Sequence, residues 1–134
     1  MNRFEIIEHP SDVGIVVFGE NLKEIFENAA FGMFSLMADL GDVELKDSFE
    51  IEVKADDQEE LLINWLNELI FLEDSKHLLL KDFKISKLAD KELKAKVTGE
   101  HIRKNLHELH RQIKAATYNQ LELKEKRAKV VFDV

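Results

Sequence analysis

The broadest apolar face in the sequence lies in residues 58–74, where apolar side chains recur at intervals of three and four. This spacing predicts one long amphipathic helix. Asp56 and Asp57 stand just before it as N-cap candidates, and Glu59 and Glu60 place negative charge near the positive end of the helix dipole. We expect this helix to be buried under a sheet and to serve the core rather than a ligand pocket. Its apolar positions are Leu61, Leu62, Trp65, Leu66, Leu69, Ile70 and Leu72.

A second amphipathic helix is expected earlier in the chain, among three predicted strands. Residues 3–8 contain β-branched and aromatic side chains, and residues 14–19 form an apolar run between two glycines, so both are predicted to be strands. Asn21 is an N-cap candidate with Glu24 at the capping-box position, and the helix that it opens ends before Gly41. Residues 48–55 alternate between apolar and polar side chains, which indicates a strand with one buried face.

The second half of the sequence favours hairpins. Residues 78–88 and 92–98 are one predicted pair of strands, and residues 113–123 and 128–134 are another. Residues 99–112 fit either a short helix or an extended exposed loop. Two helices and about seven strands indicate a single α+β domain over residues 1–134. We expect two layers, with the helices packed on a mostly antiparallel sheet.

The composition excludes several classes of protein. The chain has 134 residues and no cysteine, so disulfides, thiolate metal sites and a thiol nucleophile are excluded. No apolar run approaches the roughly 20 residues that span a bilayer. The N-terminus lacks the basic start and apolar run of a signal peptide. We therefore expect a cytoplasmic protein without membrane contact.

The charge is uneven along the chain. The formal net charge is −8; residues 1–100 hold 11 basic and 23 acidic side chains, whereas residues 101–134 hold 8 and 4. An acidic body argues against direct binding to a phosphate backbone, and it suits a basic partner or a cation. Solubility alone is the alternative explanation of this charge.

Three oxygen donors form a candidate metal site. Asp12 lies in a tight connection between two predicted strands, where an aspartate often serves the turn itself. Asp133 follows an apolar run, and the main-chain carboxylate of Val134 stands beside it. Carboxylates held this close repel each other unless a cation neutralises them. If the fold brings Asp12 near, the three hard donors suit Ca²⁺ or Mg²⁺, whereas a fraying terminus would bind nothing.

The histidines and glycines give weaker signals. His9 stands beside the Asp12 turn, where it could order the turn or donate a hydrogen bond to a substrate. His101, His107 and His110 do not have zinc-ligand spacing. The five glycines form neither of the phosphate-binding patterns, so we expect no direct nucleotide binding.

Several separate stretches match one protein family. Residues 9–15, His-Pro-Ser-Asp-Val-Gly-Ile, resemble the His-Thr-Ala-Asp-Val-Gly-Ile opening of archease, and residues 61–69 are similar to its long-helix signature. The helix over residues 26–34, Gly99-Glu100 followed by His107, residues 114–119 and the closing residues 131–134 continue the pattern in the same order. The resemblance to archease therefore spans the whole chain.

The resemblance implies an accessory protein of the RtcB-type tRNA-splicing ligase, which seals RNA ends through a guanylylated histidine. Such a protein promotes guanylylation of the ligase by GTP and multiple turnover, is not an enzyme itself, and meets RNA only through the ligase. The resemblance also implies a site for a divalent metal, Ca²⁺ with Mg²⁺ or Mn²⁺ as alternatives, held by Asp12, Asp133 and Val134. The expected supporting or partner-binding residues are His9, His107, Lys114 and Tyr118.

The sequence departs from the family pattern at a few positions. Pro10-Ser11 replaces the usual Thr-Ala, and Asn119 replaces the usual histidine after Tyr118. Asparagine cannot titrate near neutral pH, so we expect no proton transfer at that position. Lys114 could form an ion pair with the acidic site or contact a partner. The alternative functions are a small metal-dependent hydrolase of phosphate esters, which would use the same carboxylates, and a chaperone-like binding module.

Overall fold

Seven strands and two long helices make up the fold, which a computed structural model describes over residues 3–8 and 12–134. Every predicted helix and strand is present. Residues 102–114 form a loop rather than a helix, with one isolated bridge between Ala38 and Leu109. The elements are β1 (Phe4–Glu8), β2 (Val13–Phe18), α1 (Leu22–Met37), the short 3-10 helix η1 (Leu40–Asp42), β3 (Asp47–Lys54), α2 (Gln58–Lys76), β4 (Leu78–Leu88), β5 (Glu92–His101), β6 (Ala115–Leu123) and β7 (Arg127–Asp133).

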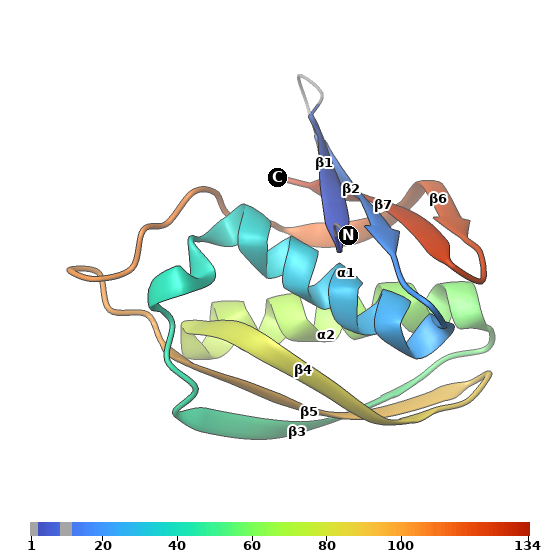
Figure 1. Cartoon of the computed structure of the whole chain (residues 1–134), viewed down its shortest axis with the longest axis horizontal. Helices are drawn as coiled ribbons and strands as arrows, with labels where there is room; N and C mark the ends of the chain where they lie inside the picture. Colours follow the sequence, from blue (N-terminus) through green and yellow to red (C-terminus); the bar gives the residue numbers. More distant parts are fainter. Residues whose placement is uncertain (1–2, 9–11) are drawn as a thin grey trace.

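The strands form two antiparallel sheets with the two helices between them (Figure 1). One sheet has the strand order β1-β2-β7-β6 and the other has the order β3-β5-β4. Helix α1 packs against β2 on one side and β4 on the other, and α2 packs against β6, β3 and β4. The α+β class, the two helices and the antiparallel pairing are confirmed. The structure has three layers, two sheets with the helices between them, whereas a single sheet was expected. The reason is that both helices bury side chains on two sides, and each side packs against a sheet.

The long helix α2 is the centre of the core, as its apolar pattern predicted. Trp65 is fully buried, and its indole N–H donates a hydrogen bond of 3.0 Å to the Phe26 carbonyl on α1. The Trp65 ring also meets the Phe83 ring of β4 edge to face, with 6.5 Å between centroids. One side chain thus joins α1, α2 and the β3-β5-β4 sheet.

Both helices begin at residues that the sequence indicated. Asn21 Oδ1 accepts the Glu24 N–H at 2.9 Å, and Asp57 Oδ1 accepts the Glu60 N–H at 2.8 Å, so Asp57 rather than Asp56 is the N-cap of α2. Helix α2 ends at Lys76, and its C-cap His77 has a left-handed backbone with φ of 55°.

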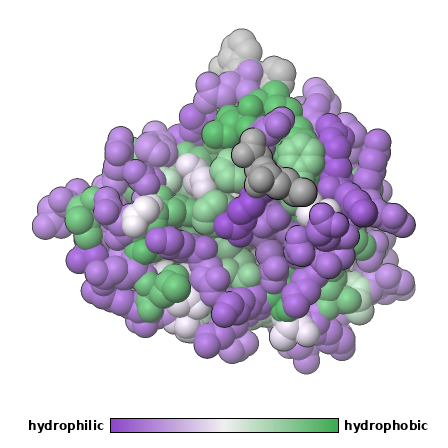
Figure 2. All heavy atoms as spheres, viewed as in Figure 1, coloured by the Kyte–Doolittle hydropathy of each residue, from purple (hydrophilic) through white to green (hydrophobic). Residues whose placement is uncertain are grey.

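The surface is predominantly polar. Figure 2 shows mostly hydrophilic residues on the face seen in Figure 1, with hydrophobic residues gathered near the top around β1. Ile6 of β1 is 50% exposed, because β1 is an edge strand. Among the described residues, neither helix has the length and apolar content that crossing a bilayer would require.

Candidate functional site

Two distant parts of the chain, β2 and β7, lie side by side in one sheet. β2 and β7 pair antiparallel, and their register ends with Val13 opposite Phe132. Asp12 directly precedes Val13, and Asp133 directly follows Phe132, so the two acidic residues lie at the same end of this strand pair. The pairing therefore brings together two of the carboxylates that the sequence singled out, and Val134 follows directly.

The alternation of the two strands explains why these carboxylates lie outside the apolar core, with Asp133 exposed and Asp12 partly buried. Val13, Ile15, Val130 and Phe132 are buried toward the helices. Asp12 and Asp133 occupy the other alternation of β2 and β7, and so they face away from the core. The apolar partners anchor the strands, and the acidic residues lie at the outer end of the same pairing.

The chemistry of this pair favours a cation. Asp12 is partly buried, and its Oδ1 atom has no hydrogen-bond partner among the described residues. A buried carboxylate oxygen without a donor is destabilising, and a second carboxylate beside it adds repulsion. A divalent ion with a preference for oxygen ligands relieves both. No group of three His, Cys, Asp or Glu side chains suited to a metal occurs in the described part of the chain.

Lys114 lies next to this pair through its backbone. The Lys114 N–H donates a hydrogen bond of 2.9 Å to the Asp133 carbonyl, and Ala115 is opposite Asp133 in the β6-β7 register. The Lys114 side chain is exposed. Among the supporting residues, Lys114 is thus placed beside the carboxylates, whereas His9 lies outside the described residues.

An asparagine that sequence reasoning missed holds β6 in this position. The side-chain amide of Asn67 on α2 binds Ala116 at two points: Oδ1 accepts the Ala116 N–H at 2.8 Å, and Nδ2 donates to the Ala116 carbonyl at 3.3 Å. This clamp aligns the start of β6 with the end of β7. The sequence signal for this contact was an asparagine beside the apolar face of the predicted helix. Its side-chain amide has no hydrogen-bond partner on the helix itself, so it needs one elsewhere.

His107 belongs to a different, buried cluster. Its Nδ1 atom accepts the Arg103 N–H at 2.8 Å, so the ring proton lies on Nε2, which donates to Glu100 Oε2 at 3.1 Å. Burial alone would raise the pKa of Glu100, but hydrogen bonds from the Glu44 N–H, His107 and Arg103 lower that pKa to about 2. His107 therefore ties the 102–114 loop to β5 and does not contact Asp12 or Asp133 in this structure.

Tyr118 lies farther along β6, where it faces the first turn of α2. Its side chain is 56% exposed. Partial desolvation and the nearby carboxylates of Glu60, Asp57 and Glu59 raise the pKa of Tyr118. The phenol is therefore protonated at neutral pH and can act as a hydrogen-bond donor at the surface. Asn119, next to it, is also exposed.

An ion pair that the sequence did not indicate ties the loop to β1. Arg111 Nη2 lies 2.9 Å from Glu8 Oε1. Glu8 is the last residue of β1 and is opposite Val13 in the β1-β2 register, so this pair lies near Asp12. The two residues are 103 positions apart, and no local pattern links them.

Comparison with known proteins identifies the family. The profile of the Archease protein family matches residues 4–134. The archease of Methanosarcina acetivorans is 35% identical over 140 aligned positions, which cover 98% of this chain and 96% of that protein. The archease of Sulfolobus acidocaldarius is 39% identical over 122 positions, covering 90% and 88% of the two chains.

Two solved structures have the same architecture. The solution structure of protein 1598 from Methanobacterium thermoautotrophicum matches with a TM-score of 0.83 and 33% identity, covering all of both chains. The crystal structure of an archease from Thermotoga maritima, described as a possible chaperone, matches with a TM-score of 0.58 and 23% identity over 97% of this chain and 96% of that one. This second match supports the fold alone. The family profile and the identities over nearly the full chain show that this chain belongs to the archease family.

Proposed function

We propose that this chain is a non-enzymatic, cytoplasmic accessory protein that activates an RtcB-type tRNA-splicing RNA ligase. It promotes guanylylation of the ligase by GTP and so allows multiple turnover. The observation that carries the proposal is that Asp12 and Asp133 flank the same end of the β2-β7 pairing, next to Val13 and Phe132. Family membership supports the choice of partner.

The residues of the site fit a divalent metal, with Asp12, Asp133 and the main-chain carboxylate of Val134 as its ligands. The Asp12 Oδ1 atom has no hydrogen-bond partner among the described residues and is available to a metal, and the three groups are hard oxygen ligands of the kind that Ca²⁺, Mg²⁺ and Mn²⁺ bind. When bound, the ion would offset the repulsion between the carboxylates and present positive charge to an anionic group of the ligase complex. The chain itself contributes rigid positioning through the β2-β7 pairing and the Asn67 clamp.

The charge distribution supports a protein partner rather than naked RNA. Residues 1–100 hold 23 acidic and 11 basic side chains, a net negative charge that repels a phosphate backbone and attracts a basic protein surface. Contact with RNA would then occur through the ligase.

A ligation assay with substoichiometric ligase, GTP and a divalent metal tests this function. We expect the wild-type protein to convert single-turnover sealing to multiple turnover, and we expect Asp12→Asn and Asp133→Asn to lose this effect. Asp90→Asn in the exposed β4-β5 turn is the matched control and keeps it. Unchanged ligation with the wild-type protein rejects the proposal, and hydrolysis of a phosphate ester by the isolated protein would favour a metal-dependent hydrolase.

Metal binding has an independent readout in thermal unfolding. At 100 times the dissociation constant, a bound ion stabilises the folded state by about 2.7 kcal/mol. We expect CaCl₂ to raise the melting temperature of the wild-type chain and of Asp90→Asn, but not of Asp133→Asn. In EDTA, Asp133→Asn should be at least as stable as wild type, because it removes carboxylate repulsion. An equal response of Asp133→Asn to CaCl₂ would exclude the assigned ligand.

A further inference from the structure

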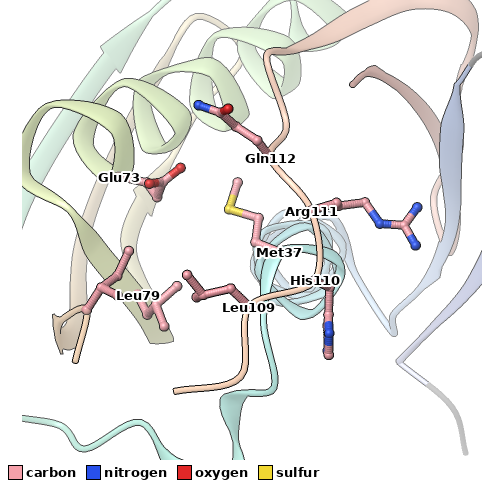
Figure 3. Close-up of a pocket in the computed structure, with 8 residues that line it drawn as sticks. Met37, Glu73, Leu79, Leu109, His110, Arg111 and Gln112 are labelled. Atoms are coloured by element: carbon pink, nitrogen blue, oxygen red, sulfur yellow. The ribbon is translucent and has the colours of Figure 1, made fainter. Parts of the chain in front are cut away.

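A pocket of about 360 Å³ lies where the 102–114 loop crosses the C-terminal ends of α1 and α2. This volume is within the range of ligand-binding pockets, which is about 300–1,000 Å³. Figure 3 shows the side chains of Met37, Leu79 and Leu109 converging inside it, with the Glu73 carboxylate beside them. The pocket thus combines an apolar floor with one acidic group on its wall.

Glu73 occupies an unfavourable place for a carboxylate. It lies in the last turn of α2, at the negative end of the helix dipole, and Asp74 adds a second negative charge. Burial and the charge of Asp74 raise the pKa of Glu73, and His77 opposes this only weakly. Among the described residues, the Glu73 carboxylate has neither an ion pair nor a hydrogen bond that would offset these effects.

The basic side chains of the pocket rim are directed elsewhere. Arg111 forms its ion pair with Glu8, at 2.9 Å, and Figure 3 shows its guanidinium pointing away from the pocket. The His110 ring also points away from Glu73 in this view. The pocket therefore presents an uncompensated negative charge next to apolar surface.

We propose that this pocket receives an arginine side chain of a basic partner protein. The methylene groups of the arginine pack against Met37, Leu79 and Leu109, and the guanidinium pairs with the Glu73 carboxylate. Arginine fits this combination better than lysine, because its guanidinium is weakly hydrated and binds a carboxylate through two parallel hydrogen bonds. This inference is independent of the proposed metal site and of the ligase, because the pocket shares no residue with Asp12, Asp133 and Val134.

The probe for this pocket is N-acetyl-arginine-N-methylamide, titrated into the ¹⁵N-labelled full chain and followed by NMR. Its control is the citrulline analogue, which has nearly the same shape but no charge. We expect the arginine probe to shift the amide signals of Glu73, Leu109 and Gln112 in a saturable way, with an affinity on the order of millimolar. A charged hydrogen bond contributes enough for the citrulline analogue to bind at least about fivefold more weakly.

Two variants separate the pocket from general electrostatic attraction. Glu73→Gln keeps the size of the side chain and is expected to weaken the arginine probe at least about fivefold. Glu68→Gln removes an exposed carboxylate of the same helix that does not line this pocket, and it should leave the affinity unchanged. The citrulline comparison on the wild-type chain tests the role of charge even if Glu73→Gln disturbs the fold.

Three results would overturn the proposal. Equal binding of the arginine and citrulline probes would show a pocket for apolar groups alone. The absence of saturable shifts up to about 50 mM probe, far above the expected dissociation constant, would show that it is an unused surface hollow. Tighter binding of free L-arginine than of the blocked probe would indicate a small-molecule site instead of a contact with a protein.

Discussion

Replacing Glu100 with alanine removes the carboxylate that holds the 102–114 loop on β5. Glu100 is 2% exposed, and its Oε2 atom accepts hydrogen bonds from the Glu44 N–H at 2.7 Å, from His107 Nε2 at 3.1 Å and from Arg103 Nη2 at 3.2 Å. Arg103 Nε lies 3.0 Å from Oε1 as part of an ion pair, without forming a hydrogen bond. Alanine leaves the three hydrogen-bond donors without their acceptor.

The expected loss of stability depends on which of these donors can form hydrogen bonds to water after the substitution. The Arg103 side chain is 38% exposed and can be hydrated, whereas the His107 side chain is fully buried and the Glu44 N–H points inward to Glu100. Each buried donor without a partner costs about 1–3 kcal/mol, and breaking a buried charge pair costs about 3–5 kcal/mol. We therefore expect Glu100→Ala to lower the free energy of unfolding by about 3–5 kcal/mol, a large part of the stability of a domain of this size.

Urea unfolding followed by far-ultraviolet circular dichroism measures this change. Glu44→Ala is the matched control: only its backbone N–H reaches Glu100, and its side chain, 59% exposed, forms a surface ion pair with Lys46. Such a pair contributes at most about 1 kcal/mol. If Glu100→Ala costs less than about 1 kcal/mol, or no more than Glu44→Ala, the network does not stabilise the loop as described.

Three further predictions concern pH and two local contacts. The pKa of Glu100 is lowered from 4.5 to about 2 on folding, so the stability difference between wild type and Glu100→Gln should be constant above pH 4.5 and should shrink as the pH falls toward 2, as pH-dependent urea unfolding can measure. Asn67→Ala removes both hydrogen bonds to Ala116, and hydrogen exchange should show reduced protection of the Ala116 amide and a loss of about 1–2 kcal/mol. Gly99→Ala should destabilise the β4-β5 pairing by about 2 kcal/mol or more in urea unfolding, because the added Cβ atom would lie 1.9 Å from the Leu79 carbonyl oxygen.

Each of these predictions has a contrasting variant or outcome. Asn64 is on the same helix as Asn67; Asn64→Ala removes a hydrogen bond to the Lys54 carbonyl of β3 and should leave Ala116 protected. Gly41→Ala should be mild, because its added Cβ atom would meet only the side-chain oxygen of Asp39, at 3.2 Å. A stability difference at Glu100 that grows as the pH falls from 4.5 to 2 would contradict the lowered pKa of this group.

Much of the secondary structure could be predicted because it depends on neighbouring residues. The intervals of three and four in residues 58–74 predicted α2, and the helix indeed buries Leu61, Trp65 and Leu69. The capping residues Asn21 and Asp57 bind N–H groups only three positions away. Such signals are contained in a few adjacent side chains, and they need no knowledge of the remaining chain.

The candidate carboxylate site was predicted in part. Its residues could be selected because Asp12 lies between two strands and Asp133 follows an apolar run at the chain end. Their position at the same end of two neighbouring strands depends on the pairing of β2 with β7, which are more than a hundred residues apart. The Asn67 clamp on β6 and the Arg111–Glu8 ion pair also join distant residues, 49 and 103 positions apart.

The sequence by itself thus determined the two helices, the strands, the acidic character of the body and the oxygen donors near both chain ends. Only the tertiary structure decided that the strands split into two sheets around the helices, that His107 turns inward to Glu100, and that Glu73 is left beside an apolar pocket. The physical reason is the range of the interactions. Periodicity and capping act within one or two turns, whereas strand partners and buried polar contacts are selected by the burial of the whole core.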